Sequence, residues 1–356
     1  MSFCYFYNMK IWFLADTHLG MKGDNEDILI DCFNYYNDIL IPYMRKNVKK
    51  DDILVHLGDV FDNRSIIGIH TIYCVIKIFE QLSEIFGDIR VCVGNHDMMQ
   101  KTSTEITALH SIKYIPNVKI YFQPTYENIC GKKVLFMPWI EDLTKQKEQI
   151  TNSNVDYIFG HLQIGGSVGA KGIKINGDNM VQPKDFKKAQ VFAGHIHIRQ
   201  DFKNVHYVGN PYHKDKGDIG NVKGITVLDI ENGETTFIEN TYSPKYIKEN
   251  IYNILNDTVG KIKKRWKNNY VDVEINSSDI ANFDYQALRD ALDNCFKELN
   301  ICPINTEGVI KVNEEKIMSE AKSSGDILND YIDETDIDDE MKTKIKDYID
   351  KFKSKL

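Results

Sequence analysis

Residues 89–97 read Ile-Arg-Val-Cys-Val-Gly-Asn-His-Asp, a short run rich in β-branched residues that ends in a glycine and three polar residues. Short apolar runs of this kind recur through the first 210 residues, and they favour buried strands. The expected strands are Lys10–Ala15, Ile53–Leu57, Ile89–Val93, Val134–Met137, Tyr157–Phe159 and Gln190–Ala193. Residues 89–97 therefore represent one strand of a larger sheet and the polar residues at its carboxyl end.

Helical patterns lie between the first of these runs. Apolar residues fall on one helix face within residues 28–40, and again within residues 69–82. This alternation of strand and helix predicts an α/β arrangement in which helices cover a sheet. Three further strands are expected at His206–Val208, Gly224–Asp229 and Glu234–Glu239, and a hairpin turn joins the last two.

Polar residues follow five of the expected strands directly. They are Asp16-Thr17-His18; Gly58-Asp59 with Asp62 three residues on; Gly94-Asn95-His96-Asp97; Gly160-His161; and Gly194-His195-Ile196-His197. In an open α/β sheet, ligands bind outside the carboxyl ends of the strands. We therefore expect these side chains to converge on one crevice, with the glycines allowing the backbone to turn sharply there.

The residue types at these strand ends indicate a metal site. Asp, Asn and His without Cys suit a hard or borderline divalent cation such as Mn²⁺, Fe²⁺ or Zn²⁺. Seven ligands drawn from these side chains would be too many for one ion and would match two. Two ions about 3.5–4 Å apart need a bridging carboxylate, and together they stabilise the attacking and leaving oxygens of a phosphoryl displacement. A single buried His or Asp is more often structural, but five clusters in order favour a dinuclear site.

The motifs DxH, GD, GNHD, GH and GHxH, in this order, resemble those of the calcineurin-like metallophosphoesterase superfamily. Three fuller motifs resemble its SbcD branch, the meiotic-recombination-eleven type of nuclease subunit in DNA double-strand-break repair, including its T-even phage members. They are Asp16-Thr17-His18-Leu19-Gly20, Gly58-Asp59-Val60-Phe61-Asp62 and Pro138-Trp139. The resemblance is strong over residues 9–213 and loose over 214–312. It implies a metallophosphoesterase β-sandwich flanked by helices, a small α+β capping domain and a C-terminal helix pair.

The resemblance also implies a role for each site residue. Asp16, His18 and His197 would hold one metal ion; Asn95, His161 and His195 would hold the other; and Asp59 would bridge both. His96 would face the scissile phosphate and stabilise the transition state or protonate the leaving oxygen, with Asp97 orienting its imidazole. The two ions are expected to be Mn²⁺, with Mg²⁺, Fe²⁺ or Zn²⁺ as alternatives. The implied activities are duplex exonuclease and single-strand or hairpin endonuclease.

The chain is expected to have four parts. A nuclease domain spans residues 1–243, a capping domain that contacts DNA spans 244–312, a polar linker spans 313–325, and a helix pair spans 326–356. Within the capping domain, an alternating strand is expected at Tyr270–Ile275 and a helix around Tyr285–Leu299.

Candidate partner contacts lie outside the metal site. Possible DNA contacts are Lys171, Lys174, Lys263, Lys264, Arg265 and Lys267, for which a plain surface loop and a solvated helix face are the alternatives. In the helix pair, two apolar stripes would grip an SbcC-type coiled-coil ATPase, or else dock on the chain's own body. They are formed by Ile327, Leu328, Tyr331, Ile332, Ile345, Tyr348, Ile349 and Phe352. A homodimer is expected through helices at residues 69–82 and 105–112.

Composition limits the remaining possibilities. The 356 residues carry a net charge of −8, which excludes a uniformly basic nucleic-acid binder but allows a local basic track. Seven cysteines without a CxxC pair favour reduced thiols and a cytoplasmic location, in the host cytoplasm if the source is viral. The sequence shows neither a secretion signal nor a membrane span, and Met9 is an alternative start. Two other functions stay open: a phosphatase of the same superfamily, and a scaffold that binds DNA ends without catalysis.

Overall fold

The computed structural model describes residues 9–304 except 101, 170–171 and 178, together with residue 343. The expected linker and helix pair, including every residue of the two apolar stripes, lie outside the described residues, and so does Lys171. Of the described residues, 9–274 and 283–302 belong to one compact unit, and 275–282 and 303–304 belong to a second. The expected domain boundaries stay predictions. Within the described residues, no helix has the length and apolar character that crossing a bilayer requires.

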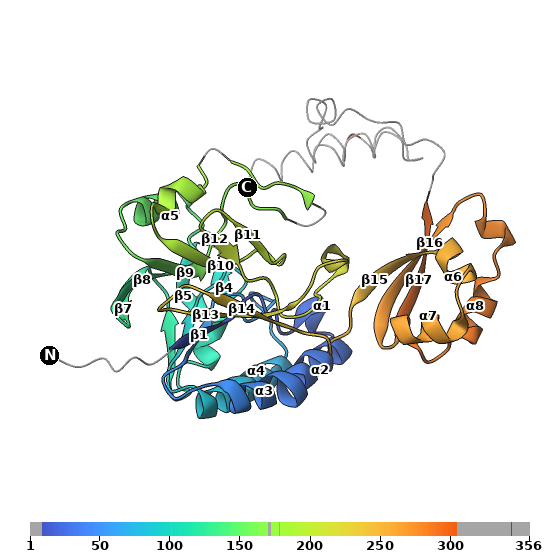
Figure 1. Ribbon diagram of the computed structural model, residues 1–356, viewed down its shortest axis with the longest axis horizontal. Helices are drawn as coiled ribbons and strands as arrows, with labels where there is room; N and C mark the ends of the chain where they lie inside the picture. Colours follow the sequence, from blue (N-terminus) through green and yellow to red (C-terminus); the bar gives the residue numbers. More distant parts are fainter. Residues whose placement is uncertain (1–8, 101, 170–171, 178, 305–342, 344–356) are drawn as a thin grey trace. The chain divides into compact units, whose positions relative to one another are not determined.

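Two six-stranded sheets make up most of the first unit (Figure 1). In spatial order the first contains β14 (Thr235–Glu239), β13 (Gly224–Asp229), β1 (Lys10–Leu14), β2 (Ile53–His56), β3 (Ile89–Cys92) and β6 (Val118–Tyr121). The second contains β11 (Gln200–Phe202), β12 (Val205–Tyr207), β10 (Gln190–Gly194), β9 (Tyr157–His161), β8 (Lys132–Met137) and β7 (Thr125–Ile129). The strands expected from the sequence are all present, within one or two residues at their ends.

The carboxyl ends of the central strands point the same way within each sheet. Strands β1, β2, β3 and β6 are parallel neighbours in the first sheet. Strands β12, β10, β9 and β8 are parallel neighbours in the second. Because parallel neighbours end at the same edge, the polar residues that follow them come together there.

Alternation along β1 shows how the layers pack. Ile11 and Phe13 belong to the core between the two sheets, where Phe13 stacks on Phe192 with ring centroids 4.7 Å apart. Trp12 and Leu14 belong to the core between the first sheet and its helices. Successive side chains of a strand point to opposite faces, so one strand supplies both cores.

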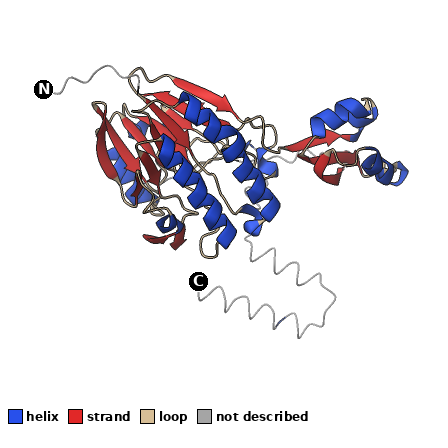
Figure 2. Ribbon diagram, turned by 90° about the horizontal axis from the view of Figure 1, so that it is seen from below, coloured by secondary structure: helices blue, strands red, loops and turns tan. Residues whose placement is uncertain are grey.

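Helices cover the outer faces of both sheets (Figure 2). The first sheet is covered by α2 (Glu26–Asn34), a π-helical segment (Tyr35–Leu40), α3 (Ile41–Asn47) and α4 (Ile69–Ile85). On the second sheet, Ile150 of α5 (Leu143–Thr151) packs with Leu135 and Ile158. Short turns lie at α1 (Met21–Asp24), Ala108–Ser111, Pro183–Phe186, Lys216–Asp218 and Ile280–Asn282. These layers match the helix-flanked β-sandwich expected from the sequence.

A third sheet has the order β15 (Tyr246–Asn250), β16 (Asn269–Asn276) and β17 (Phe296–Ile304). Its helices are α6 (Ile251–Leu255), α7 (Val259–Trp266) and α8 (Tyr285–Ala291). The helix expected to reach Leu299 is wrong in its second half, because residues 296–304 form β17. Pairing within a sheet outweighs a short apolar pattern that fits either structure.

The helix expected at residues 105–112 is also wrong. A two-stranded hairpin of β4 (Met98–Gln100) and β5 (Ser103–Thr107) lies there, followed by a single turn of 3₁₀ helix. The strands exchange backbone hydrogen bonds that the sequence pattern alone does not reveal. Any dimer surface built on these residues would therefore be a hairpin and not a helix.

Candidate metal centre

The polar residues after β1, β2, β3, β9 and β10 meet at one place, where the edges of both large sheets come together. Four of them, Asp16, His18, Asp59 and His195, have positive φ angles between 43° and 93°. This left-handed conformation is uncommon for residues other than glycine, and it clusters at functional sites. The backbone therefore bends sharply after the strands and turns these side chains toward one another.

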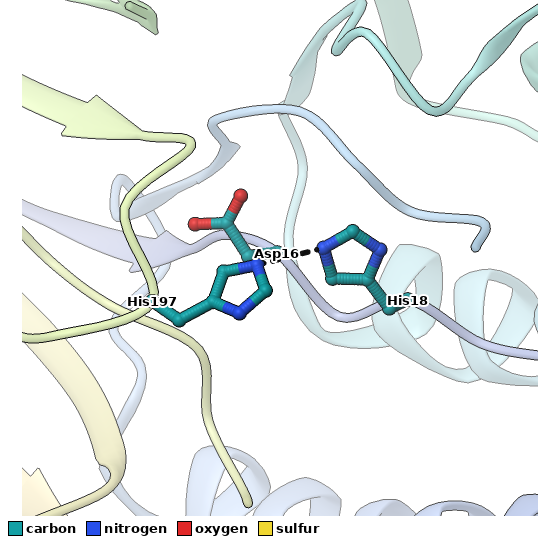
Figure 3. Close-up of side chains that lie close together, drawn as sticks. All are labelled: Asp16, His18 and His197. Atoms are coloured by element: carbon teal, nitrogen blue, oxygen red, sulfur yellow. Dashed lines mark hydrogen bonds between the residues drawn. The ribbon is translucent and has the colours of Figure 1, made fainter. Parts of the chain in front are cut away.

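The first ligand group consists of Asp16, His18 and His197 (Figure 3). Their ligand atoms all lie within 4.8 Å of one another. The Nε2 atoms of His18 and His197 are 3.0 Å apart. The carboxylate of Asp16 also accepts the backbone N–H of His195 at 2.8 Å, so this contact links the first group to the strand end that carries the second.

The second ligand group consists of Asn95, His161 and His195. The Oδ1 atom of Asn95 lies 2.9 Å from His161 Nε2 and 3.0 Å from His195 Nδ1. His161 is fully buried, and its Nδ1–H donates to the carbonyl of Leu57 at 2.9 Å. That hydrogen bond leaves Nε2 of the neutral ring with its lone pair directed at the other ligand atoms.

Asp59 lies between the two groups. One carboxylate oxygen, Oδ2, is 3.6 Å from His18 Nε2 and 3.4 Å from His161 Nε2. The other oxygen accepts the backbone N–H of His96 at 2.8 Å, which fixes the carboxylate in this orientation. The Asp59 carboxylate thus approaches a histidine from each group, and the Asp16 carboxylate also lies 3.9 Å from Nδ1 of His161.

The pKa values of four of these side chains are shifted, by burial and by the neighbouring charges. Burial raises the pKa of Asp16 to about 7. Burial acts to lower the pKa of His161, but the nearby Asp59 and Asp16 carboxylates raise it to about 9. Burial lowers the pKa of His195 to about 3 and holds that of His197 well below its ordinary value. Deprotonated imidazoles and carboxylates are donors that divalent cations bind, and a cation would displace the protons of His161 and Asp16, so the residues fit a metal centre.

His96 borders both groups. Its Nδ1–H donates to the carbonyl of Asp62 at 2.6 Å, which leaves Nε2 unprotonated in the neutral ring. The ring meets that of His18 edge to face, with centroids 4.8 Å apart. His96 also groups with His18 and Asp59 as a third possible cluster of metal ligands. Its role as a residue facing the phosphate stays a prediction.

The expected role of Asp97 needs correction. Its carboxylate does not orient the imidazole of His96, whose Nδ1 is taken by Asp62. Instead it accepts four backbone N–H groups at 2.9–3.1 Å, from Asp59, Val60, Phe61 and Gly94. Burial raises the pKa of Asp97 to about 7. Asp97 therefore shapes the loop that carries Asp59, because it supplies acceptors to backbone groups that no strand satisfies.

The glycines in these motifs allow two loops to lie in close contact, and they also allow the backbone to turn sharply. A Cβ atom on Gly94 would lie 2.2 Å from both the backbone N and the Oδ1 of Asp59. Gly58 has a φ of 98°, and a Cβ there would lie 2.6 Å from His161 Nδ1. Both glycines therefore permit the packing of one ligand loop against another.

Three residues to which the sequence analysis assigned no role, Asp62, Lys214 and Lys223, support the site. Asp62 contacts His18 Nδ1 at 3.1 Å through Oδ1, and Lys214 Nζ at 2.7 Å. Lys223 is buried and donates to the carbonyl of His197 at 2.8 Å. Asp62 belongs to a motif that the sequence shows. Lys223 lies outside every motif, so nothing in the sequence around it indicates its contact with the candidate ligand His197.

Residues given other roles from the sequence lie as follows. His56 is a core histidine, buried in β2 with Nε2 3.1 Å from the hydroxyl of Thr17. Lys174 lies in the loop between β9 and β10. In α7 and just after it, Arg265 is paired with Glu249 and Asp257, each at 2.6 Å, whereas Lys263, Lys264 and Lys267 show no ion pair within the described residues.

Comparison with known proteins assigns the class. The chain belongs to the calcineurin-like phosphoesterase family, whose family model matches residues 9–199. It is 34% identical over 245 residues to "Exonuclease subunit 1" of Enterobacteria phage T4, a match that covers 65% of this chain and 68% of that protein.

Similar solved structures share much less sequence. An archaeal phosphodiesterase is 17% identical with a TM-score of 0.35, over 65% of this chain and all of the other. A phosphopantetheinyl hydrolase from Mycobacterium tuberculosis is 12% identical with a TM-score of 0.30, over 57% and 90% of the two chains.

Proposed function

We propose that this chain is a DNA nuclease that depends on two divalent metal ions, most simply Mn²⁺. The observation that carries the proposal is the position of Asp59 Oδ2, 3.6 Å from a histidine of one ligand group and 3.4 Å from a histidine of the other. A bridging carboxylate between two groups is what a dinuclear phosphoesterase needs. The likeness to a phage exonuclease subunit supports DNA as the substrate.

The side chains suit hydrolysis of a phosphodiester. Two bound ions would supply a nucleophile near neutral pH and stabilise the charge that develops on the phosphate. Asp16, His18 and His197 would hold one ion; Asn95, His161 and His195 would hold the other. The carbonyl of Asp62 holds Nδ1–H of His96, so Nε2 would face the phosphate. In its doubly protonated form, the ring would donate a hydrogen bond or a proton from Nε2 to the leaving oxygen.

A basic groove near α7 supports contact with a DNA backbone. A cavity of about 720 Å³ is lined by Lys245, Lys248, Lys264, Arg265 and Lys267, among others. Lys248 is paired with Glu274 at 2.6 Å, so Lys264 and Lys267 are the more available cations. Phosphate contacts of this kind would give an affinity that falls steeply with salt.

The nuclease would act with other chains. The T4 relative is named as a subunit, which supports a partner, and we propose a coiled-coil ATPase of the SbcC type held by residues 326–356. We also propose a homodimer. Ile66, in the loop before α4, and Ile69, the first residue of α4, are 81% and 87% exposed, and large apolar side chains exposed together mark contact surfaces.

Cleavage of linear duplex, single-stranded and hairpin DNA tests the proposal. We expect cleavage with Mn²⁺, none with chelator, and none for Asp59→Ala, which should also lose both ions. Asp201→Ala is the matched control, because Asp201 pairs with His206 at 2.8 Å on the surface. Hydrolysis of phosphomonoesters without DNA cleavage would indicate a phosphatase, and DNA binding without cleavage would indicate a scaffold; either result would overturn the proposal.

A further inference from the structure

Lys223 is a buried lysine whose ammonium contacts one of the metal-ligand segments. It lies just before β13 and is 3% exposed. Its Nζ donates to the carbonyl of His197 at 2.8 Å, to Asn210 Oδ1 at 2.5 Å and to Asp218 Oδ1 at 2.5 Å. An ammonium has three N–H donors, so all three are used. One of them fixes the backbone of a candidate metal ligand.

Asp218 connects this lysine to a second one. Its other oxygen, Oδ2, accepts the backbone N–H of Lys214 at 2.7 Å. The Nζ of Lys214 lies 2.7 Å from Asp62 Oδ1, and the same oxygen lies 3.1 Å from His18 Nδ1. A chain of polar contacts therefore runs from the backbone of His197 to the imidazole of His18.

The two ends of this chain are the two histidines of the first ligand group. Their Nε2 atoms are 3.0 Å apart, so a small displacement of either would change the geometry offered to an ion. The second group is held differently: the Leu57 carbonyl fixes His161, and the Asn95 amide oxygen contacts both His161 and His195. Within the described residues, Lys214, Asp218 and Lys223 make no hydrogen bond or ion pair with the second group.

We propose that Lys214, Asp218 and Lys223 form a positioning clamp for one metal ion of the pair. The clamp fixes His18 and His197 and leaves the second ligand group independent of it. The inference rests on the two-ion site proposed above. Its physical basis is burial: a paired and fully hydrogen-bonded ammonium holds one geometry, whereas removal of one partner leaves the other charge buried and unpaired. Partners behind a metal-ligating histidine commonly govern affinity for the ion.

Titration of the metal-free full chain with Mn²⁺, followed by electron paramagnetic resonance, tests the clamp. The wild type should bind two ions and show the signal of a coupled pair. Lys223→Met should weaken binding of one ion by about 10–100-fold, leaving the signal of a single ion in the second group. Lys216→Met is the matched control: it lies in the same segment but pairs with Asp272 at 2.7 Å, and it should bind two ions like the wild type.

A double variant separates positioning from stability. Lys223→Met leaves Asp218 unpaired, so Lys223→Met/Asp218→Asn should recover thermal stability without recovering the first ion. If both ions are weakened equally, or if the double variant regains both, the lysine serves general stability and the clamp is wrong. If the wild type and Lys223→Met both bind two ions, the clamp is wrong but the two-ion site stands. A wild type that binds only one ion overturns the two-ion site as well.

Discussion

Asp62 contacts two imidazoles at the edge of the candidate metal centre, those of His96 and His18. The backbone carbonyl of Asp62 accepts the Nδ1–H of His96, while its carboxylate contacts His18 and Lys214. Burial acts to raise the pKa of Asp62, but the contacts with His18 and Lys214 hold it below its ordinary value, so the carboxylate stays ionised. One residue thus sets the orientation of two imidazoles, by its backbone for one and its side chain for the other.

Substitution of His96 by alanine should separate catalysis from metal binding. We expect turnover to fall by about 10²-fold or more, the range for losing a general acid or a charge-stabilising group. Mn²⁺ stoichiometry and DNA affinity, measured by calorimetry and by fluorescence anisotropy, should change little. If instead His96→Ala loses an ion, the cluster of His18, Asp59 and His96 is a ligand set and the proposed role is wrong.

Metal affinity should rise with pH. The metal-free site holds a proton on His161, with a pKa of about 9, and a partly populated proton on Asp16, with a pKa of about 7. Both groups must lose their protons to bind a cation, so binding releases protons and strengthens from pH 6 to pH 9. The slope should be steeper below pH 7, where both protons are displaced, than above it.

Calorimetric titration with Mn²⁺ in two buffers of different ionisation enthalpy measures this release directly. The heat should depend on the buffer at pH 7, and the affinity should increase between pH 6 and pH 8. Equal affinity at both pH values would contradict the assignment of Asp16 and His161 as ligands.

At the scale of elements, the loop after β2 and the loop after β3 are built against each other. Asp97 of the second loop accepts backbone N–H groups of the first, and Gly94 allows the two backbones to touch. The position of the Asp59 carboxylate, which we propose bridges the two ions, therefore depends on the contact between two loops, and not on its own strand alone.

Gly94→Ala should disturb this contact. Its Cβ would lie 2.2 Å from Asp59 N and Oδ1, so Asp59 must move away from its position between the ligand groups. We expect loss of metal binding and of cleavage, together with a lower melting temperature. Gly87→Ala, just before β3, is the control, because no atom lies within 4 Å of a Cβ there; it should behave like the wild type. Retention of two ions by Gly94→Ala would show that the loops adjust independently.

For the whole molecule, the open question is how the nuclease is coupled to its partner. Residues 326–356 carry no residue of the metal centre, whose last member is His197. Two short amphipathic helices would be marginal in water by themselves, so they need a surface to pack on. A partner ATPase and the chain's own nuclease unit are the two surfaces that the sequence analysis considered.

Deletion of residues 326–356 distinguishes these two surfaces. We expect the truncated chain to keep its melting temperature and its cleavage of short single strands, and to lose co-purification with a coiled-coil ATPase. The single substitution Ile345→Asp in the full chain changes one apolar stripe only. It should also abolish co-purification with the ATPase while the melting temperature and cleavage are kept. Unchanged affinity for the ATPase, or a truncated chain that no longer folds, would contradict the partner role.

Sequence alone determined the order of strands and the residues that end them. The positions of two motifs at strand ends could be predicted, namely Gly58-Asp59 and Gly94-Asn95-His96-Asp97. Strand periodicity and the polar residues that follow a strand are local properties of the sequence. The same local reading failed at residues 296–304, where pairing with other strands decided between helix and strand.

Only the tertiary structure decided which group each polar atom contacts. Asp97 neighbours His96 in the chain, yet its carboxylate is used by backbone N–H groups some 37 residues earlier in the sequence. Lys223 reaches the carbonyl of His197 from a segment without any motif, and Asp59 Oδ2 lies between histidines that come from separate strands. Such contacts depend on how two sheets bring distant loops together, and buried polar atoms then pair with whatever partner the packing provides.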